Sequence, residues 1–469
     1  GGFGSAPKFP HFPSLSFSIA NCSSDLDRKK IKYTLDRMCV SGINDPVDGG
    51  FFRYSVDDLW MIPHFEKMLY DNGPMMSVLC DSHAVFDDSF YLKKANEIFK
   101  WVNNFMTSEH GGFYSTIDAD SEGEEGKYYV FSQKELKENF NEEDFKLINE
   151  YFTDSGKTNF EGSYHLHVYR KKELVFKKDI NKFENIMNKL CELRKDKIMP
   201  GIDTKILLSW NCLYIKGLIK LYKISNNKNV LKVIDKSFEF IFKSLVTDKV
   251  IYSCFNGKPC FPGYLDDYAL LVSSLIDYLS IQWSDKHYEL SKRVCEDLIT
   301  SFEDKKKGGY FFTSNNHEKL FYRPKSTSDD SVPSGLVYAT DALLQMGYLS
   351  GDQRFIDSAD RSINYVRKSF GDNGDNMTSN VSAINLLHNE NIEREIIIVR
   401  CSEPSWNEII KERAYYDKFI LYINNDYKDL PDAIKSKKPQ GDFSAYICQG
   451  MSCLKPITNL KDFITHLHV

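Results

Sequence analysis

The sequence has no long hydrophobic run and no excess of positive charge. No window approaches the ~18 consecutive apolar residues that a membrane-spanning helix needs, so we expect no membrane association. The 66 Asp and Glu outnumber the 60 Lys and Arg, which gives a formal net charge of −6. Because nucleic-acid binding requires a basic face, we also expect no nucleic-acid partner.

Several signatures of cofactor binding and catalysis are absent as well. The chain has no G-x-x-x-x-G-K-[ST] or G-x-G-x-x-G loop, no G-x-S-x-G elbow and no H-E-x-x-H motif. Its 11 cysteines include no C-x-x-C pair, and the closest two are Cys448 and Cys453. We therefore expect no cofactor, no metal centre and reduced thiols in a cytoplasmic protein.

The sequence does contain many segments with helical periodicity. Within 268–279, apolar residues recur at i, i+3, i+4, i+7, i+8 and i+11, which is one face of a helix. Similar patterns predict about twelve helices in all. The others are expected at 28–41, 65–87, 91–106, 143–152, 179–195, 207–223, 234–245, 286–302, 335–349, 353–369 and 378–390.

A glycine–aromatic signature recurs between these helices. Two adjacent glycines permit a positive-φ turn, and the aromatic residue after them favours a short strand. The four copies are Gly1-Gly2-Phe3, Gly49-Gly50-Phe51, Gly111-Gly112-Phe113 and Gly308-Gly309-Tyr310. Repeats at the spacing of a helical hairpin are typical of stacked or closed arrays. We therefore expect an all-α protein, an (α/α)6 toroid over residues 1–391 with short β-hairpins at its rim.

The last 78 residues differ in character. Segments 395–400 and 419–423 are short, β-branched apolar runs, and 445–448 is a third candidate strand. A helix is expected between the first two, near 405–413. These patterns predict a small C-terminal β/α appendage over residues 392–469.

The densest polar block lies between residues 53 and 72. Pro63 is expected to open a helix that places His64 and Asp71 on one face. His64 and Glu66 are candidate catalytic residues, because a histidine beside carboxylates can transfer protons near neutral pH. Candidate substrate-binding residues in this block are Arg53, Tyr54, Trp60, Tyr70, Asp71 and Asn72. Alternatively, the charges are helix ion pairs and His64 is a polar contact at the helix start.

An acidic run follows at residues 117–126, with five carboxylates in eight residues. Asp118 and Asp120 are candidate catalytic carboxylates, and Glu122 is a candidate binding residue. The run begins like a calcium loop, but its twelfth position is Tyr129 instead of a bidentate Glu, which excludes an EF-hand. Another calcium geometry and a solvated acidic loop remain alternatives to paired carboxylates acting on a sugar.

Further polar residues recur where helices are expected to begin. Aromatic faces stack on the C–H faces of sugars, and carboxylates and amides bind hydroxyls, so together these residues suit a polyol. The candidate binding residues are Asp203, Lys205, Trp210, Asn211, Asp266, Asp267, Tyr268, Arg323 and Ser334. The alternative is that the Asp and Ser residues are helix caps.

Several of these blocks closely resemble the YyaL-type family, which includes the spermatogenesis-associated thioredoxin-like proteins. The resemblance is carried by 1–10, 49–72, 111–129, Asn159-Phe160-Glu161-Gly162, Asp203-Thr204-Lys205, Trp210-Asn211, Leu265-Asp266-Asp267-Tyr268, Pro333-Ser334-Gly335 and the Cys448/Cys453 segment. It implies a thioredoxin-like N-terminal domain followed by a toroid similar to N-acylglucosamine 2-epimerases and six-hairpin glycosidases. Leu336 stands where relatives tend to have Asn, which departs from the family pattern.

The resemblance aligns Gly1 with the start of the toroid, so we expect the thioredoxin-like part to lie upstream as a partner domain. Two functional hypotheses follow. The first is a sugar-active enzyme with a small-molecule sugar ligand: an epimerase or isomerase using His64, or a glycoside hydrolase using Glu66 with Asp118 or Asp120. The second is a non-catalytic ligand- or client-binding module that works with the thioredoxin-like domain.

Overall fold

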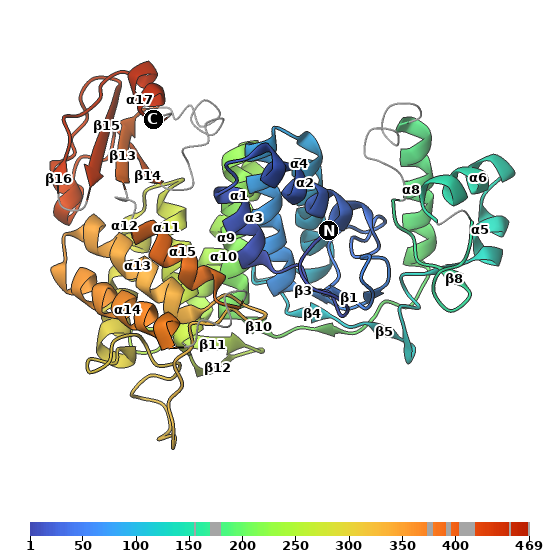
Figure 1. Ribbon diagram of the computed structural model, residues 1–469, viewed down its shortest axis with the longest axis horizontal. Helices are drawn as coiled ribbons and strands as arrows, with labels where there is room; N and C mark the ends of the chain where they lie inside the picture. Colours follow the sequence, from blue (N-terminus) through green and yellow to red (C-terminus); the bar gives the residue numbers. More distant parts are fainter. Residues whose placement is uncertain are drawn as a thin grey trace. The chain divides into compact units, whose positions relative to one another are not determined.

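Helices dominate the computed structural model, which describes residues 1–153, 156–168, 180–372, 379–390, 395–402, 418–449 and 452–467 (Figure 1). These residues form fifteen α-helices, most of them joined in consecutive pairs. The chain divides into two compact units, Gly1–Ile206 and Leu207–Val469. No described helix is long and apolar enough to cross a lipid bilayer.

The first unit is built on helices that pack as neighbours. Helix α3 packs against both α1 and α4, and α1 also packs against α2. Asp88 caps α4 by accepting the backbone N–H of Phe90 at 3.1 Å. The helices of this unit are α1 (Phe12–Ala20), α2 (Asp25–Val40), α3 (Leu69–Phe86), α4 (Ser89–Trp101), α5 (Gln133–Asn139), α6 (Glu142–Tyr151) and α8 (Ile180–Lys195).

The strands of this unit are two residues long and pair in small antiparallel ladders. One ladder joins β1 to β2, a second runs β3-β4-β9, and two more join β5 to β6 and β7 to β8. Their bounds are β1 (Tyr54–Ser55), β2 (Pro63–His64), β3 (Lys67–Met68), β4 (Thr116–Ile117), β5 (Asp120–Ser121), β6 (Glu124–Glu125), β7 (Phe131–Ser132), β8 (Ser163–Tyr164) and β9 (Ile202–Asp203).

Helices α5, α6 and α8 form a group of their own beside β8 (Figure 1). Their shared core includes Leu136, Ile148, Phe152 and Leu190, all of which are buried. Ser132 and Glu135 close a capping box at the start of α5, which satisfies the first backbone N–H groups of that helix.

The second unit repeats one packing pattern three times. Helices α9, α11 and α13 lie in a row, because α11 packs against both of the others. Each is paired with the helix that follows it, α10, α12 or α14. The helices are α9 (Leu208–Ser225), α10 (Lys228–Ser244), α11 (Leu265–Leu279), α12 (Asp285–Asp297), α13 (Gly335–Ser350), α14 (Gln353–Asp372) and α15 (Val381–Glu390). Strand β11 (Tyr252–Phe255) pairs with β12 (Pro259–Pro262), and β10 (Ile206–Leu207) lies at the junction of the units.

The C-terminal residues form a four-stranded sheet, drawn in red in Figure 1, in the order β14-β13-β15-β16. Strand β13 (Glu395–Cys401) runs parallel to β14 (Lys418–Asn424) and antiparallel to β15 (Phe443–Gln449), which pairs with β16 (Ser452–Cys453). Helix α17 (Leu460–Leu467) buries Phe463 and Leu467 against this sheet.

The expected helices and C-terminal strands are confirmed with small shifts of their ends. The segments expected at 91–106 and 286–302 are α-helices that continue as the π-helices η1 (Val102–Met106) and η2 (Leu298–Phe302). Helices α1, α5 and α17 were not expected. The helix proposed near 405–413 lies outside the described residues, and closure into a toroid and the 391/392 boundary stay predictions.

Two expectations are wrong. Pro63 does not open a helix: it lies in β2, and α3 begins six residues later at Leu69, because backbone pairing with β1 fixes this segment as a strand. The thiols are also not all reduced, since Cys448 and Cys453 form a disulfide. These two residues are paired directly across the β15–β16 ladder. Their separation of five residues in the sequence did not by itself indicate this pairing. The other nine cysteines carry thiols.

Candidate functional site

A short hairpin holds His64 in place. In the β1–β2 ladder Tyr54 lies directly opposite His64, and their rings stack with centroids 5.1 Å apart and planes 19° apart. Asp57 stabilises the connection by accepting the backbone N–H of Leu59 and of Ile62, each at 2.6 Å. The imidazole therefore rests on an aromatic face that the backbone register positions.

Both ring nitrogens of His64 face carboxylates. Nδ1 lies 2.8 Å from Oε1 of Glu125 in β6, and Nε2 lies 4.0 Å from Oε2 of Glu66. The side chain of His64 is 31% exposed, so a ligand can reach it. A carboxylate on one nitrogen fixes the tautomer and leaves the other nitrogen to exchange protons.

A buried acid and an arginine complete this group. Arg53 donates to Glu66 Oε2 at 3.3 Å and lies over the ring of Tyr70, 5.8 Å from its centroid. Asp71, in the first turn of α3, is only 5% exposed, and its Oδ2 has no hydrogen-bond partner among the described residues. Burial raises the pKa of Asp71 well above its ordinary value; the charge of Glu66 adds to this, and Arg53 opposes it.

We call these seven residues the His64 cluster: Arg53, Tyr54, His64, Glu66, Tyr70, Asp71 and Glu125. Six of them were expected at the site from sequence. Glu125 was recognised only as part of the acidic run, because nothing in a sequence tells that a residue 61 positions later will bind His64. The cluster offers a positioned imidazole, a cation, an aromatic face and a buried acid whose pKa is raised.

The acidic run forms a β-hairpin. Strands β5 and β6 pair through a two-residue turn in which Glu122 and Gly123 both have positive φ, 55° and 80°, as a type I′ hairpin requires. Lys127 forms ion pairs with Glu124 at 2.7 Å and Glu122 at 3.5 Å. No three His, Cys, Asp or Glu side chains in the described part of the chain are grouped to hold a metal ion.

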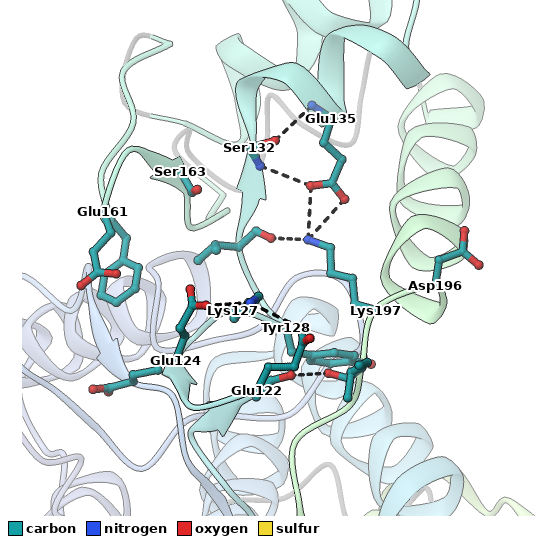
Figure 2. Close-up of a pocket in the computed structure, with 15 residues that line it drawn as sticks. Glu122, Glu124, Lys127, Tyr128, Ser132, Glu135, Glu161, Ser163, Asp196 and Lys197 are labelled. Atoms are coloured by element: carbon teal, nitrogen blue, oxygen red, sulfur yellow. Dashed lines mark hydrogen bonds and ion pairs between the residues drawn. The ribbon is translucent and has the colours of Figure 1, made fainter.

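This hairpin borders a cavity of about 550 Å³ (Figure 2). Glu161 and Ser163 lie on one side of it, and Lys197 with Glu135 on the other. Six carboxylates and two lysines contribute to the lining, which is Ser121, Glu122, Glu124, Glu125, Lys127, Tyr128, Val130, Ser132, Glu135, Phe160, Glu161, Ser163, Asp196, Lys197 and Ile198. Glu125 thus belongs both to the cavity wall and to the His64 cluster.

A buried ion network supports the same region. Asp45 receives Lys67 Nζ at 2.7 Å and Arg194 Nη1 at 2.7 Å, and all three side chains are 1–2% exposed. Arg194 also bonds Asp48 at 3.0 Å and the carbonyl of Tyr129 at 3.0 Å. Although burial opposes ionisation of Asp45, the two cations hold its pKa below the ordinary value. The network ties α8 to the segments that carry the cluster.

In the second unit, a pair of aspartates lies where three helices begin. Asp267 accepts the backbone N–H of Ser209 at 3.2 Å and of Tyr264 at 2.9 Å, which joins the starts of α9 and α11. Asp266 lies against Gly335 at the start of α13, where a Cβ atom would come within 2.0 Å of Asp266 Oδ1. Burial, together with the charge of Asp267, raises the pKa of Asp266 to about 7.

Several expected site residues hold the fold by packing or backbone contacts. Trp60 is 1% exposed and donates to the carbonyl of Gly1 at 3.1 Å. Asn72 is fully buried and bonds both backbone groups of Phe51. Asn211 is 1% exposed and donates to the carbonyl of Leu207 at 2.9 Å. Their assignment to ligand binding stays a prediction.

The remaining expected residues are more exposed. Asp118, Asp120 and Glu122 are all exposed on the acidic hairpin or beside it. Among the described residues, no hydrogen bond or ion pair joins Asp118 or Asp120 to Glu66. Ser334 is buried and caps the start of α13. The side chains of Asp203 and Lys205 form an ion pair at 3.0 Å, and Arg323 lies over the ring of Phe311. Asp203, Lys205 and Arg323, and also Trp210 and Tyr268, are partly or fully exposed.

Curated relatives share a quarter or more of their aligned residues with the chain. No family model matches it. Human spermatogenesis-associated protein 20 is 25% identical over 545 residues, covering 100% of this chain and 67% of its own length. The rat protein of the same name is 27% identical over 409 residues, covering 76% and 52%. An uncharacterized Caenorhabditis elegans protein is 28% identical over 394 residues, covering 74% and 54%. The chain thus spans two thirds of the human relative and about half of the other two.

Among solved structures, cellobiose 2-epimerase from Bacillus thermoamylovorans has a similar fold. The TM-score is 0.52 at 11% sequence identity, and the match covers 78% of this chain and 81% of the epimerase. At this identity the likeness concerns the fold alone. It agrees with the paired helices of both units and leaves the chemistry to the residues themselves.

Proposed function

Because this chain belongs to the family of spermatogenesis-associated protein 20, and because its fold is like that of a sugar epimerase, we propose that it is a carbohydrate-active protein of the sugar epimerase or isomerase type. One observation carries the proposal. His64 is partly exposed, stacked on Tyr54 and fixed between Glu66 and Glu125, beside Arg53. An oriented imidazole next to a cation and an aromatic face suits proton transfer on a sugar.

The proposed base is Nε2 of His64. Glu125 accepts the Nδ1–H, so Nε2 carries the lone pair and can remove a proton from the carbon next to a sugar carbonyl. Arg53 would bind the oxygen on which negative charge develops, since a guanidinium stabilises such charge without giving up a proton.

Asp71 is the proposed acid. Burial raises the pKa of its carboxyl group and so favours the protonated form, which can donate to the sugar oxygen while His64 accepts a proton from carbon. Return of the proton from His64 to the neighbouring carbon gives an isomer, whereas an epimer also requires a proton donor on the opposite face of the carbon. One base and one acid are therefore sufficient for the isomerisation.

A glycoside hydrolase is less well supported. Hydrolysis needs two carboxyl groups about 5–9 Å apart on either side of the glycosidic bond. Asp118 and Asp120, the carboxyl groups expected to act with Glu66, are both exposed. The His64 cluster instead brings together a histidine and a buried acid whose pKa is raised.

Solvent exchange tests the proposal directly. The chain is incubated in D2O with a panel of aldoses, ketoses, amino sugars and disaccharides, and carbon-bound deuterium is followed by NMR. We expect deuterium next to the carbonyl carbon of one sugar, and a fall of roughly 10²–10⁴-fold in His64→Asn, the usual contribution of a general base. His110→Asn is the matched control, because His110 is 64% exposed and pairs with the adjacent Glu109.

Two results would contradict the proposal. One is the release of reducing ends without deuterium uptake, which would indicate hydrolysis. The other is equal loss of exchange in the His64 and His110 variants, which would remove the role of the cluster.

A second candidate function is a non-catalytic module that binds a ligand or client for a thioredoxin-like domain. It is suggested by the resemblance of the sequence to a family that includes the spermatogenesis-associated thioredoxin-like proteins. It predicts saturable sugar or client binding without deuterium uptake. Substitutions in the His64 cluster would then change the affinity for the sugar or client, and no catalysed reaction would be detected in the unaltered chain.

A further inference from the structure

The C-terminal sheet carries a disulfide at its edge. Cys448 in β15 and Cys453 in β16 are directly opposite partners in the ladder, and their sulfurs are bonded. Cys448 is 7% exposed, whereas Cys453 and its neighbours Ser452 and Leu454 are exposed. One half of the bond therefore faces solvent and the other half faces the protein.

A cation lies beside the exposed half. Lys437, which follows the 3-10 helix η5 (Asp432–Ser436), donates from Nζ to Cys453 Sγ at 2.9 Å. Its ammonium also lies over the ring of Tyr446, 5.7 Å from the centroid. A positive group at hydrogen-bond distance stabilises a thiolate and so favours its formation. Burial lowers the pKa of Lys437, and a thiolate at Cys453 would counteract that effect.

The disulfide is not required to bring these two strands together. The backbone N–H of Leu454 already donates to the carbonyl of Ile447 at 2.8 Å, and Gln449 pairs with Ser452 in the same ladder. The two cysteines are also only five residues apart, and a short loop is where a cross-link restricts the unfolded chain least. A bond placed there, exposed and beside a lysine, is suited to being opened.

We propose that Cys448–Cys453 is a thiol–disulfide exchange site for a dithiol, in which Cys453 is the exchanging sulfur and Cys448 is the resolving one. The proposal is independent of the sugar chemistry. It rests on the asymmetric exposure of the two sulfurs, on the contact with Lys437 and on the backbone hydrogen bonds that join the two strands beside the disulfide.

The exchange balances in two steps. A thiolate of the dithiol attacks Cys453 Sγ, the bond to Cys448 breaks, and Cys448 leaves as a thiolate that takes a proton. The second thiol of the dithiol then loses its proton and attacks the first sulfur of the dithiol, which is bonded to Cys453 in the mixed disulfide. This step releases Cys453 as a thiolate beside Lys437. The dithiol is oxidised to a disulfide by two electrons, and the protein disulfide is reduced to two thiols.

The first experiment uses the unaltered chain. It is equilibrated with mixtures of reduced and oxidised dithiothreitol, the free thiols are alkylated, and the peptides with Cys448 and Cys453 are quantified by mass spectrometry. Circular dichroism at the same ratios reports whether the chain stays folded. We expect reversible reduction in the folded protein. A bond that opens only when the chain unfolds would overturn the proposal.

The second experiment tests Lys437. In Cys448→Ser the remaining Cys453 thiol is reacted with iodoacetamide at pH 7, alone and combined with Lys437→Gln. We expect the lysine substitution to slow alkylation by roughly threefold or more, because fewer thiols are ionised. Lys435→Gln is the control, since Lys435 is exposed, lies two residues away and carries the same charge.

Equal alkylation rates in the two lysine variants would overturn the assigned role of Lys437. If Cys448→Ser does not fold, the rate at which dithiothreitol reduces the folded chain is compared between Lys437→Gln and Lys435→Gln instead. Slower reduction, or a bond harder to reduce at equilibrium, in Lys437→Gln alone supports the proposal, and no difference overturns it.

Discussion

At the scale of single residues, Asp266 makes stability depend on pH. Its pKa in the folded chain is about 7, against 3.8 for an unperturbed Asp, because of burial and then of the charge on Asp267. Between these values the folded state binds more protons than the unfolded state, so stability falls as pH rises. In Asp266→Asn this loss is absent. We expect the difference between the melting temperature of Asp266→Asn and that of the wild type to increase in favour of the variant from pH 5 to pH 8.

Asp330→Asn provides the control for this comparison, because Asp330 is exposed in the same unit. Thermal unfolding followed by circular dichroism at several pH values is the measurement. Parallel curves for wild type and Asp266→Asn would show that the carboxyl of Asp266 ionises normally in the folded chain.

Asp71 allows a sharper separation of stability from activity. Burial raises the pKa of Asp71, so Asn imitates the protonated form that burial favours. We expect Asp71→Asn to fold with unchanged or higher thermal stability and to lose deuterium exchange by roughly 10²-fold or more, because the amide cannot donate a proton in the same way. Reduced stability with unchanged exchange would instead mean a structural carboxylate.

The sequence could predict which residue types gather in the His64 cluster but not how they meet. His64, Glu66 and Asp71 were expected together on a helix, yet they lie on a two-residue strand, a connection and a first helical turn. The stacking of Tyr54 on His64 depends on register between strands too short to show alternation. Local pattern therefore identified the block and long-range pairing set its geometry.

At the scale of elements, periodicity was enough for the longer helices. The amphipathic faces of α10 and α11 are visible in the sequence because each spans about four turns. Helix α5 has only seven residues, but its capping box, Ser132 with Glu135, is a sequence signal that could have located it. The two-residue strands offer no such signal, since a period of two cannot be seen in two residues.

The buried network predicts how strongly α8 is tied to the rest of its unit. Arg194→Met removes the hydrogen bonds to Asp45, Asp48 and Tyr129 and leaves Asp45 with only Lys67 of its two described cations. Removing one partner of a buried ion pair costs about 3–5 kcal/mol. We expect a loss of that order in urea unfolding.

Lys195→Met is the matched control, because Lys195 is the next residue of α8, is 69% exposed and pairs with Glu192. Exposed substitutions usually change stability by less than about 0.5 kcal/mol. Equal destabilisation by the two variants would mean that the Arg194 contacts add nothing beyond helix packing.

At the scale of the whole molecule, the fold could be predicted further than the function. Repeated glycine–aromatic turns between helix pairs indicated an array of hairpins, and α9, α11 and α13 do lie in a row with their partners. Gly49 and Gly308 have the expected positive φ of 84° and 79°. Closure of the array depends on contacts between distant parts of the chain, and the proposed reaction depends on contacts such as Arg53–Glu66 and His64–Glu125, whose residues are 13 and 61 positions apart.

Charge then predicts which sugars the chain prefers. The net charge is −6, and six carboxylates against two lysines line the cavity that Glu125 shares with the His64 cluster. A field of one sign attracts oppositely charged ligands and repels like-charged ones. If the cavity receives the sugar, amino sugars should raise the melting temperature most, neutral sugars less and uronic acids least. A ligand at 100 times its dissociation constant stabilises by about 2.7 kcal/mol, a shift of a few degrees for a chain of this size.

Thermal unfolding with each class of sugar at low salt is the measurement, repeated at about 0.5 M salt, where screening should narrow the differences. Glu125→Gln should reduce the preference for amino sugars, whereas Glu138→Gln, at an exposed residue outside the cavity, should preserve it. Stabilisation by uronic acids equal to that by amino sugars would show that the acidic wall does not face the bound sugar, and the search for the ligand would move to the aspartate pair at the helix starts of the second unit.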